Sequence, residues 1–209
     1  MTDRLLRELE THRAGFTRLL DGLPSDIVHA TPSAGAWSLA QIAEHLALID
    51  AGLRLGGPKM PAAGWATSRA RAAALRAVFA LPVRIPAPPG AEGVMPSANP
   101  RWPEVRERWA ATRAGWRGAE ARCAGRVAYA HPLLGPSLLR DALAFLLAHH
   151  RHHDAQVRRT LERVMGDERR VMSPARDIGA YRPGAGRPAP YRLPSPLGRE
   201  TPTGSAQPG

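Results

Sequence analysis

The 209-residue chain contains one cysteine, Cys123, and one lysine, Lys59. A single cysteine excludes an intramolecular disulfide and any metal site built from several cysteines, and it is typical of a reducing compartment. No apolar run reaches the ~18–20 residues that cross a bilayer. The N-terminus enters an amphipathic pattern at once and lacks the apolar block of a signal peptide. We therefore expect a cytoplasmic protein that has no membrane partner.

The basic residues are almost all arginine, and the formal net charge is +11. A nucleic-acid partner requires clustered cations, whereas these arginines are spread along the chain with acids between them. Alanine, glycine and proline are over-used as well, with 20 Gly and 21 Pro. This skew is typical of a GC-rich genome, so the charge argues against nucleic acid as a partner.

Apolar residues recur at helical spacing in four long segments, over residues 3–21, 39–53, 104–122 and 138–165. A weaker, Ala- and Arg-rich helix is expected over residues 68–80. Ser38 and Gln41 form a capping-box pattern at the start of the second segment. No segment alternates with a period of two. The pattern predicts an all-α protein, an antiparallel up-and-down four-helix bundle over residues 1–165.

Proline and glycine gather outside these helices. A Pro-rich connector is expected over residues 82–103, and 14 of the 37 residues from Ser173 to Gly209 are Pro or Gly. A segment with so few large apolar side chains cannot bury enough surface to offset the entropy of ordering it. We expect residues 166–209 to form an Arg-, Pro- and Gly-rich disordered C-terminal tail.

Four of the eight histidines fall in one five-residue stretch, residues 149–153, inside the last predicted helix. His149 and His153 are four apart, so they share one helix face and can bind one metal ion. By the same geometry, His150 and His152 are expected at flanking or exposed positions. A third ligand must come from another helix, and His45 lies on the apolar face of the 39–53 segment. The alternative is that these are core histidines hydrogen-bonded to neighbours.

Other polar residues near these histidines are assigned simpler roles. His12 is expected to form a core hydrogen bond, and Glu44 and Asp154 are expected to be surface carboxylates, because each is turned about 100° from the adjacent histidine. Gln156 faces inward and is a candidate to orient a ligand on its own helix. Cys123 lies in an apolar stripe with two tryptophans and is expected to be a core residue.

Two sequence segments together resemble the DinB/YfiT-like superfamily: WSLAQIAEHL, residues 37–46, and HHRHHDAQ, residues 149–156. Members carry a "WS…HL" segment on the second helix and "HxxHHxxQ" on the last. The segment HPLLG, residues 131–135, also resembles the turn that precedes their last helix. The resemblance implies a four-helix bundle that binds a divalent ion, zinc or nickel, through three histidines. These map onto His45, His149 and His153.

Three neutral imidazoles leave a metal ion its full charge and at least one open position, as in catalytic zinc sites. The superfamily includes transferases and an isomerase that use low-molecular-weight thiols such as bacillithiol or mycothiol. The resemblance therefore implies first the transfer of a small-molecule thiol to a small electrophilic substrate. Hydrolysis by metal-bound water and a non-catalytic metal-binding bundle remain alternatives, and a homodimer remains open. The sequence lacks the G-x-S-x-G and phosphate-loop motifs.

Overall fold

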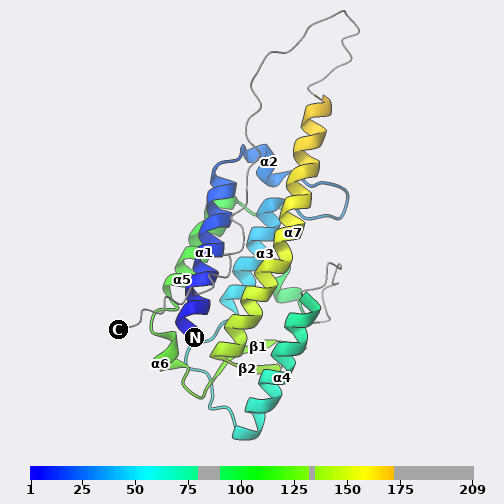
Figure 1. Ribbon diagram of the computed structural model, residues 1–209. Coiled ribbons are helices and arrows are strands. Elements are labelled where there is room, and N and C mark those ends of the chain that lie inside the picture. Colours follow the sequence, from blue (N-terminus) through cyan, green and yellow to red (C-terminus); the bar gives the residue numbers. More distant parts are fainter. Residues whose placement is uncertain (80–89, 132–134, 172–209) are drawn as a thin grey trace, which may run out of the picture. The chain divides into compact units, whose positions relative to one another are not determined.

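The computed structural model describes residues 1–79, 90–131 and 135–171 (Figure 1). Almost all of the regular structure in these ranges is helical. In chain order the elements are α1 Thr2–Asp21, α2 Ser25–His29, α3 Leu39–Ala51, α4 Ala62–Phe79, η1 Glu92–Val94, α5 Trp102–Ala114, α6 Ala119–Arg122, β1 Val127–His131, β2 Gly135–Leu138 and α7 Leu139–Val171.

Helices α1, α3, α5 and α7 form a four-helix bundle, and a further long helix, α4, packs along α7 (Figure 1). The predicted all-α four-helix bundle is confirmed. Side-chain pairs give the chain directions: Glu44 and Asp50 of α3 pair with Arg108 and Arg113 of α5, so these two helices run parallel. Helices α1 and α7 also run parallel, because Glu8 pairs with Arg151 and His12 pairs with Asp154.

The two parallel pairs run in opposite directions, because Trp37 at the start of α3 lies beside His153 while His45, further along, contacts His149. The bundle is therefore antiparallel between pairs and parallel within them, which refines the expected up-and-down arrangement. Helix α4 explains why α3 and α5 run parallel. It returns the chain along α7, so α5 starts at the same end of the bundle as α3 (Figure 1).

Local sequence signals set several helix ends where they were expected. The Ser38 hydroxyl accepts a hydrogen bond from the Gln41 backbone N–H, and the Gln41 side chain accepts one from the Ser38 N–H, which is the predicted capping box. The predicted 104–122 helix is interrupted, however. It ends at Ala114 and resumes as α6, because Gly118 takes a left-handed conformation with φ +69°.

A short β-hairpin, β1–β2, which the sequence pattern did not predict, lies at the position of the expected turn 131–135. The strands pair antiparallel from Val127 with Leu138 to His131 with Gly135, and residues 132–134 lie outside the described residues. A register shift between Val127 and Tyr129 buries two consecutive residues of β1, so the strand shows no alternation of period two. The second strand has four residues, too few for a pattern.

Helix α7 continues to Val171, six residues beyond the helix end expected at about residue 165. The helical pattern weakens there because polar residues replace the apolar stripe. Residues 172–209 of the expected tail and residues 80–89, in the Pro-rich connector, lie outside the described residues. In the described part of the chain, no helix combines the length and apolar character needed to cross a membrane.

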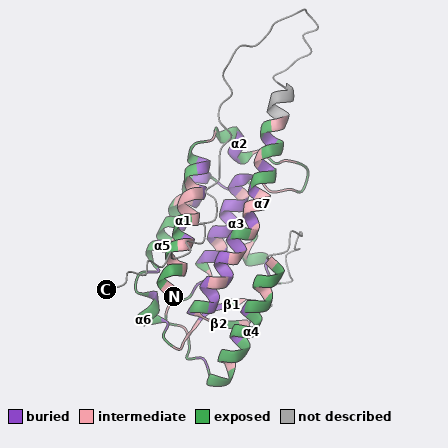
Figure 2. Ribbon diagram, in the orientation of Figure 1, coloured by how far each residue is buried: buried purple, intermediate pink, exposed green. Residues whose placement is uncertain are grey.

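The interior is built around α3, whose residues are buried in ten of thirteen positions (Figure 2). One apolar cluster lies towards the hairpin, around Leu143, Phe145 and Leu146. A second surrounds Leu39, Ile42 and Trp109. Because α3 is enclosed by other elements, any polar side chain on it needs a partner from another part of the chain.

Two glycines offer a matched test of how closely the chain around Gly57 packs against strand β1. A Cβ at Gly57 would lie 2.2 Å from the Val127 carbonyl oxygen, whereas one at Gly15, within α1, would meet nothing within 4 Å. We expect Gly57→Ala to lower the free energy of unfolding by about 1–3 kcal/mol through overpacking. Gly15→Ala should raise it by about 0.5–1 kcal/mol, because alanine loses less entropy in a helix. Urea unfolding measures the free energy of unfolding of both variants. Equal midpoints would contradict the close approach of Gly57 to Val127.

Candidate metal centre

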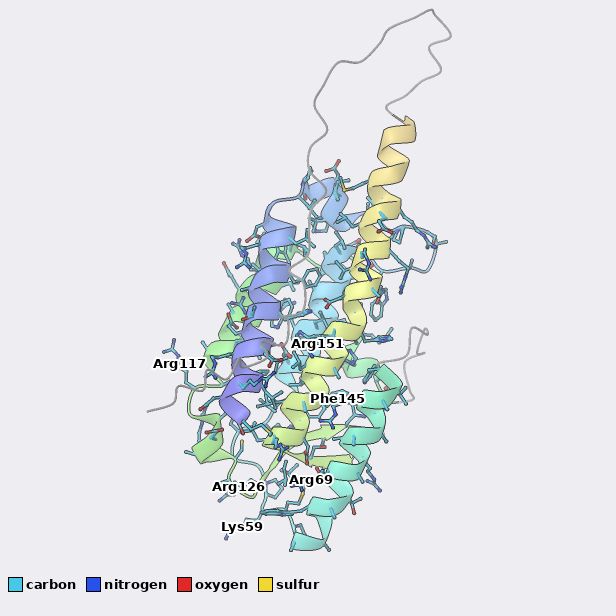
Figure 3. All side chains as sticks on the ribbon, in the orientation of Figure 1. Lys59, Arg69, Arg117, Arg126, Phe145 and Arg151 are labelled. Carbon is cyan, nitrogen blue, oxygen red and sulfur yellow. The ribbon has the colours of Figure 1, made fainter. Side chains whose placement is uncertain are left out.

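The three histidines singled out in the sequence meet inside the bundle. His45 comes from α3, and His149 and His153 come from successive turns of α7, on the stretch marked by the labelled Phe145 and Arg151 (Figure 3). His149 Nε2 lies 3.0 Å from His45 Nε2 and 3.1 Å from His153 Nε2. All three side chains are buried. The fold therefore brings together the three predicted ligands from two helices.

The outer ring nitrogens of two of these histidines are held by oxygen acceptors. His45 Nδ1 lies 2.7 Å from the Val94 carbonyl oxygen, and His153 Nδ1 lies 2.7 Å from Gln156 Oε1. A carbonyl oxygen can only accept, so Nδ1 carries the proton in both neutral rings. Each Nε2 then presents a lone pair to the centre of the cluster. The predicted orienting role of Gln156 agrees with this contact.

A divalent cation fits this arrangement. His149 Nδ1 is buried and has no hydrogen-bond partner among the described residues. If it bears the proton, three Nε2 lone pairs face one another, and if it does not, a buried lone pair is unpaired. A cation among the three Nε2 atoms satisfies the facing lone pairs. Two nitrogens bound to one zinc at about 2.0–2.1 Å and at the tetrahedral angle lie roughly 3.3 Å apart, within a few tenths of an ångström of the observed separations.

Burial also keeps the three imidazoles neutral. It lowers the pKa of His45, and it lowers the pKa of His149 strongly, where the nearby His153 adds to the effect. The pKa of His153 falls to about 3, first through burial and then through His45. Metal binding requires neutral imidazoles, so the free protein presents its ligands in the form that a metal ion needs.

A loop clamped to α3 supplies the Val94 carbonyl. The Ser97 N–H and hydroxyl both donate to Glu44 Oε2 at 2.7 Å, and the Gln41 side chain donates to the Ser97 carbonyl. Glu44 was expected to be a surface carboxylate, and that expectation was wrong: it is buried beneath this loop and also pairs with Arg108. Sequence position alone did not reveal a loop packed on that face of the helix.

Aromatic rings surround the histidine cluster. The Trp37 ring centroid lies 4.9 Å from that of His45 and 6.4 Å from that of His153. The Phe79 centroid lies 4.9 Å from that of His149, and the Phe145 centroid lies 5.7 Å from it. The imidazoles therefore face an apolar environment, in which charge–charge and ion–dipole interactions are stronger than in water.

The expectation that His150 is flanking or exposed was wrong. Its side chain is 0% exposed, its Nε2 donates to Asp50 Oδ1 at 3.0 Å, and its Nδ1 lies 3.3 Å from His12 Nδ1. Helix α7 contacts α1, α3 and α4, so it buries more than the single face assumed from its periodicity. His152 is half-buried, as expected for a flanking position, and donates to the Phe79 carbonyl.

A buried polar cluster at Asp50 was missed in the sequence. Asp50 Oδ2 accepts from Trp109 Nε1 at 2.5 Å and from Arg113 Nε at 2.9 Å. The available signal was an aspartate within the apolar run LALIDAGL. His12 forms the expected hydrogen bond, but at the edge of the core: its Nε2 lies 2.6 Å from Asp154 Oδ1, and the Asp154 side chain is 47% exposed.

Comparison with known proteins finds a family match that spans all three histidines. The sequence model of the DinB superfamily matches residues 8–157, most of the chain. This chain belongs to the DinB superfamily. The comparison with curated proteins finds no match for it. Among solved structures it is similar to YfiT from Bacillus subtilis, described as a probable metal-dependent hydrolase with an unusual four-helix bundle topology. The TM-score is 0.46 at 15% identity, over 79% of this chain and 87% of that one.

The metal-binding role of the DinB-superfamily triad can be tested by single substitutions. We expect His45→Ala, His149→Ala and His153→Ala each to lower the affinity for Zn²⁺ by at least tenfold, because each removes one of three nitrogens. His152→Ala should change it less than threefold, since its ring nitrogen bonds a backbone carbonyl. Competition with a chromophoric chelator measures these affinities. Similar losses from all four variants would contradict the assignment.

Acid should destabilise the metal-free protein. A histidine with a folded pKa below its unfolded value of about 6.5 is protonated more readily in the unfolded chain, so stability falls as pH drops from about 6.5 towards 3. The slope is about 1.4 kcal/mol per pH unit for each such imidazole. Urea midpoints at pH 7 and pH 5, with a chelator present, measure this. A flatter dependence is expected for His153→Gln, and identical slopes would contradict the buried neutral state.

Proposed function

We propose that this DinB-superfamily chain is a metal-dependent transferase that joins a low-molecular-weight thiol to a small electrophilic substrate. In this proposal His45, His149 and His153 hold the ion, zinc or nickel. The observation that carries it is the convergence of three Nε2 atoms, with no carboxylate of the described residues hydrogen-bonded to any of the three rings.

The charge balance of the site supports this chemistry. The nearest acids along the two helices are engaged elsewhere: Glu44 bonds Ser97 and Arg108, and Asp154 bonds His12. Three neutral imidazoles therefore leave an ion its full double charge. A divalent ion in this setting is a Lewis acid that lowers the pKa of a bound thiol or water.

The residues around the triad favour a thiol over water. Trp37 and Phe79 place aromatic rings against the imidazoles, and the Gln156 amide occupies the outer nitrogen of His153. The ion would lower the pKa of bound water as well as that of a bound thiol, so proton removal does not separate hydrolysis from thiol transfer. The soft sulfur of a thiolate is compatible with the apolar wall, whereas the rings of Trp37 and Phe79 offer no acid or base to move protons at a reacting oxygen. These contacts support thiol transfer as the leading function.

Cobalt substitution tests the proposal directly. Binding of bacillithiol, mycothiol or glutathione to the Co²⁺ protein should produce a sulfur-to-metal charge-transfer band in the near ultraviolet, and the thiol that binds should support conjugation of a model electrophile. His45→Ala should lose both signals, while His152→Ala keeps them. If none of the three thiols changes the spectrum or supports conjugation, thiol transfer is wrong, and hydrolysis of a model ester becomes the reaction to test.

A further inference from the structure

A single buried carboxylate joins three helices next to the triad. Asp50, at the end of α3, is 0% exposed, and both of its oxygens are used. Oδ2 accepts from Trp109 and Arg113 of α5, and Oδ1 accepts from His150 of α7. Burial raises the pKa of Asp50, but His150, Arg113 and Trp109 together outweigh it and lower the pKa overall. The carboxylate therefore stays charged inside the bundle.

This carboxylate lies about one and a half helical turns beyond the metal ligand of its own helix, and it bonds the residue that follows His149 on the opposite helix. His45 precedes Asp50 by five residues on α3, and His149 directly precedes His150 on α7. His149 and His153 share α7, so the helix itself sets their spacing. The separation of His45 from His149, by contrast, depends on how α3 and α7 are placed against each other.

Apolar packing between helices is non-directional, whereas a hydrogen bond between buried groups has a defined distance and angle. Among the hydrogen bonds of the described residues, the His150–Asp50 bond is the side-chain link between α3 and α7 outside the triad. His149 has no hydrogen bond on its outer nitrogen to orient it. The His150–Asp50 bond is thus the directional contact available to set the register of the two ligand-bearing helices.

We propose that Asp50 and His150 are positioning residues of the metal centre: their hydrogen bond fixes α3 against α7 and so holds His45 within ligand distance of His149. This inference rests on the proposed metal site and not on the reaction carried out there. His150 then contributes to metal affinity without binding the ion. Residues hydrogen-bonded to metal ligands commonly contribute 10- to 100-fold to affinity, and we expect an effect of the same size from a bond that places the ligand-bearing helices.

This role is tested by substitutions that remove a hydrogen bond to the Asp50 carboxylate from either α7 or α5. His150→Phe keeps a ring but removes the link to α7, and we expect it to lower Zn²⁺ affinity about 10- to 100-fold. His150→Gln keeps an N–H donor near the former Nε2 and should restore affinity to within threefold of the native chain. Trp109→Phe breaks a bond from α5 to the same carboxylate and should also stay within threefold.

Affinities are measured by chelator competition at a temperature at which circular dichroism shows each variant fully helical. Native affinity in His150→Phe, or an equal loss in Trp109→Phe, would overturn the proposal. Should His150→Phe not fold, solvent exchange in the native protein replaces it: Zn²⁺ should slow exchange of the His150 Nε2 proton more than that of the Trp109 Nε1 proton, and equal slowing would overturn it. A native chain that binds no Zn²⁺ would overturn the metal site as well, whereas failure of thiol transfer leaves this result intact.

Discussion

Helix α3 carries two acids and a histidine into the interior, and each requires a partner from another part of the chain. Glu44 is satisfied by the loop at Ser97 and by α5, His45 by Val94 and α7, and Asp50 by α5 and α7. These contacts therefore fix the positions of α5, α7 and the loop around residues 92–98 relative to α3. The histidine cluster is one consequence of this requirement.

The polar contacts follow the parallel pairing of helices. In a parallel pair, successive turns of one helix meet successive turns of the other in the same order, which is why Glu44 and Asp50 reach Arg108 and Arg113. The extra helix α4 makes this order accessible, and it also places Phe79 beside His149. An arrangement that satisfies buried charge thus also supplies the apolar wall of the candidate metal centre.

Much of the fold and the triad could be predicted because the signals were local. The capping box at Ser38 involves residues three apart, and the pairing of His149 with His153 follows from helix geometry. Two imidazoles on one helix leave a metal ion mostly bare, so His45 on the apolar face of the 39–53 segment was the candidate third ligand, and the resemblance to the superfamily supported it. What was missed depends on the neighbours of each element. The burial of His150 requires knowing that α7 is covered on several sides, and the burial of Glu44 requires knowing that a loop packs on α3.

The hairpin and the break after Ala114 were missed for a different reason. A bulge in β1 removes the alternation that identifies a strand. Gly115 and Gly118, within the predicted 104–122 helix, indicate only that a break is permitted there. The apolar stripe itself was predicted correctly, because Trp109, Trp116 and Cys123 are all buried. Interior positions were therefore easier to recognise than the path of the backbone between them.

The two halves of the triad lie 104 residues apart along the chain, between His45 and His149. A partly synthesised chain that ends before α7 contains one of the three imidazoles and has no site for an ion. An ion held by all three imidazoles could therefore bind only after the last helix has docked against α3. Acquisition of metal would then report completion of the fold, and ions would bind poorly to shorter, truncated chains because such chains lack two of the three nitrogens.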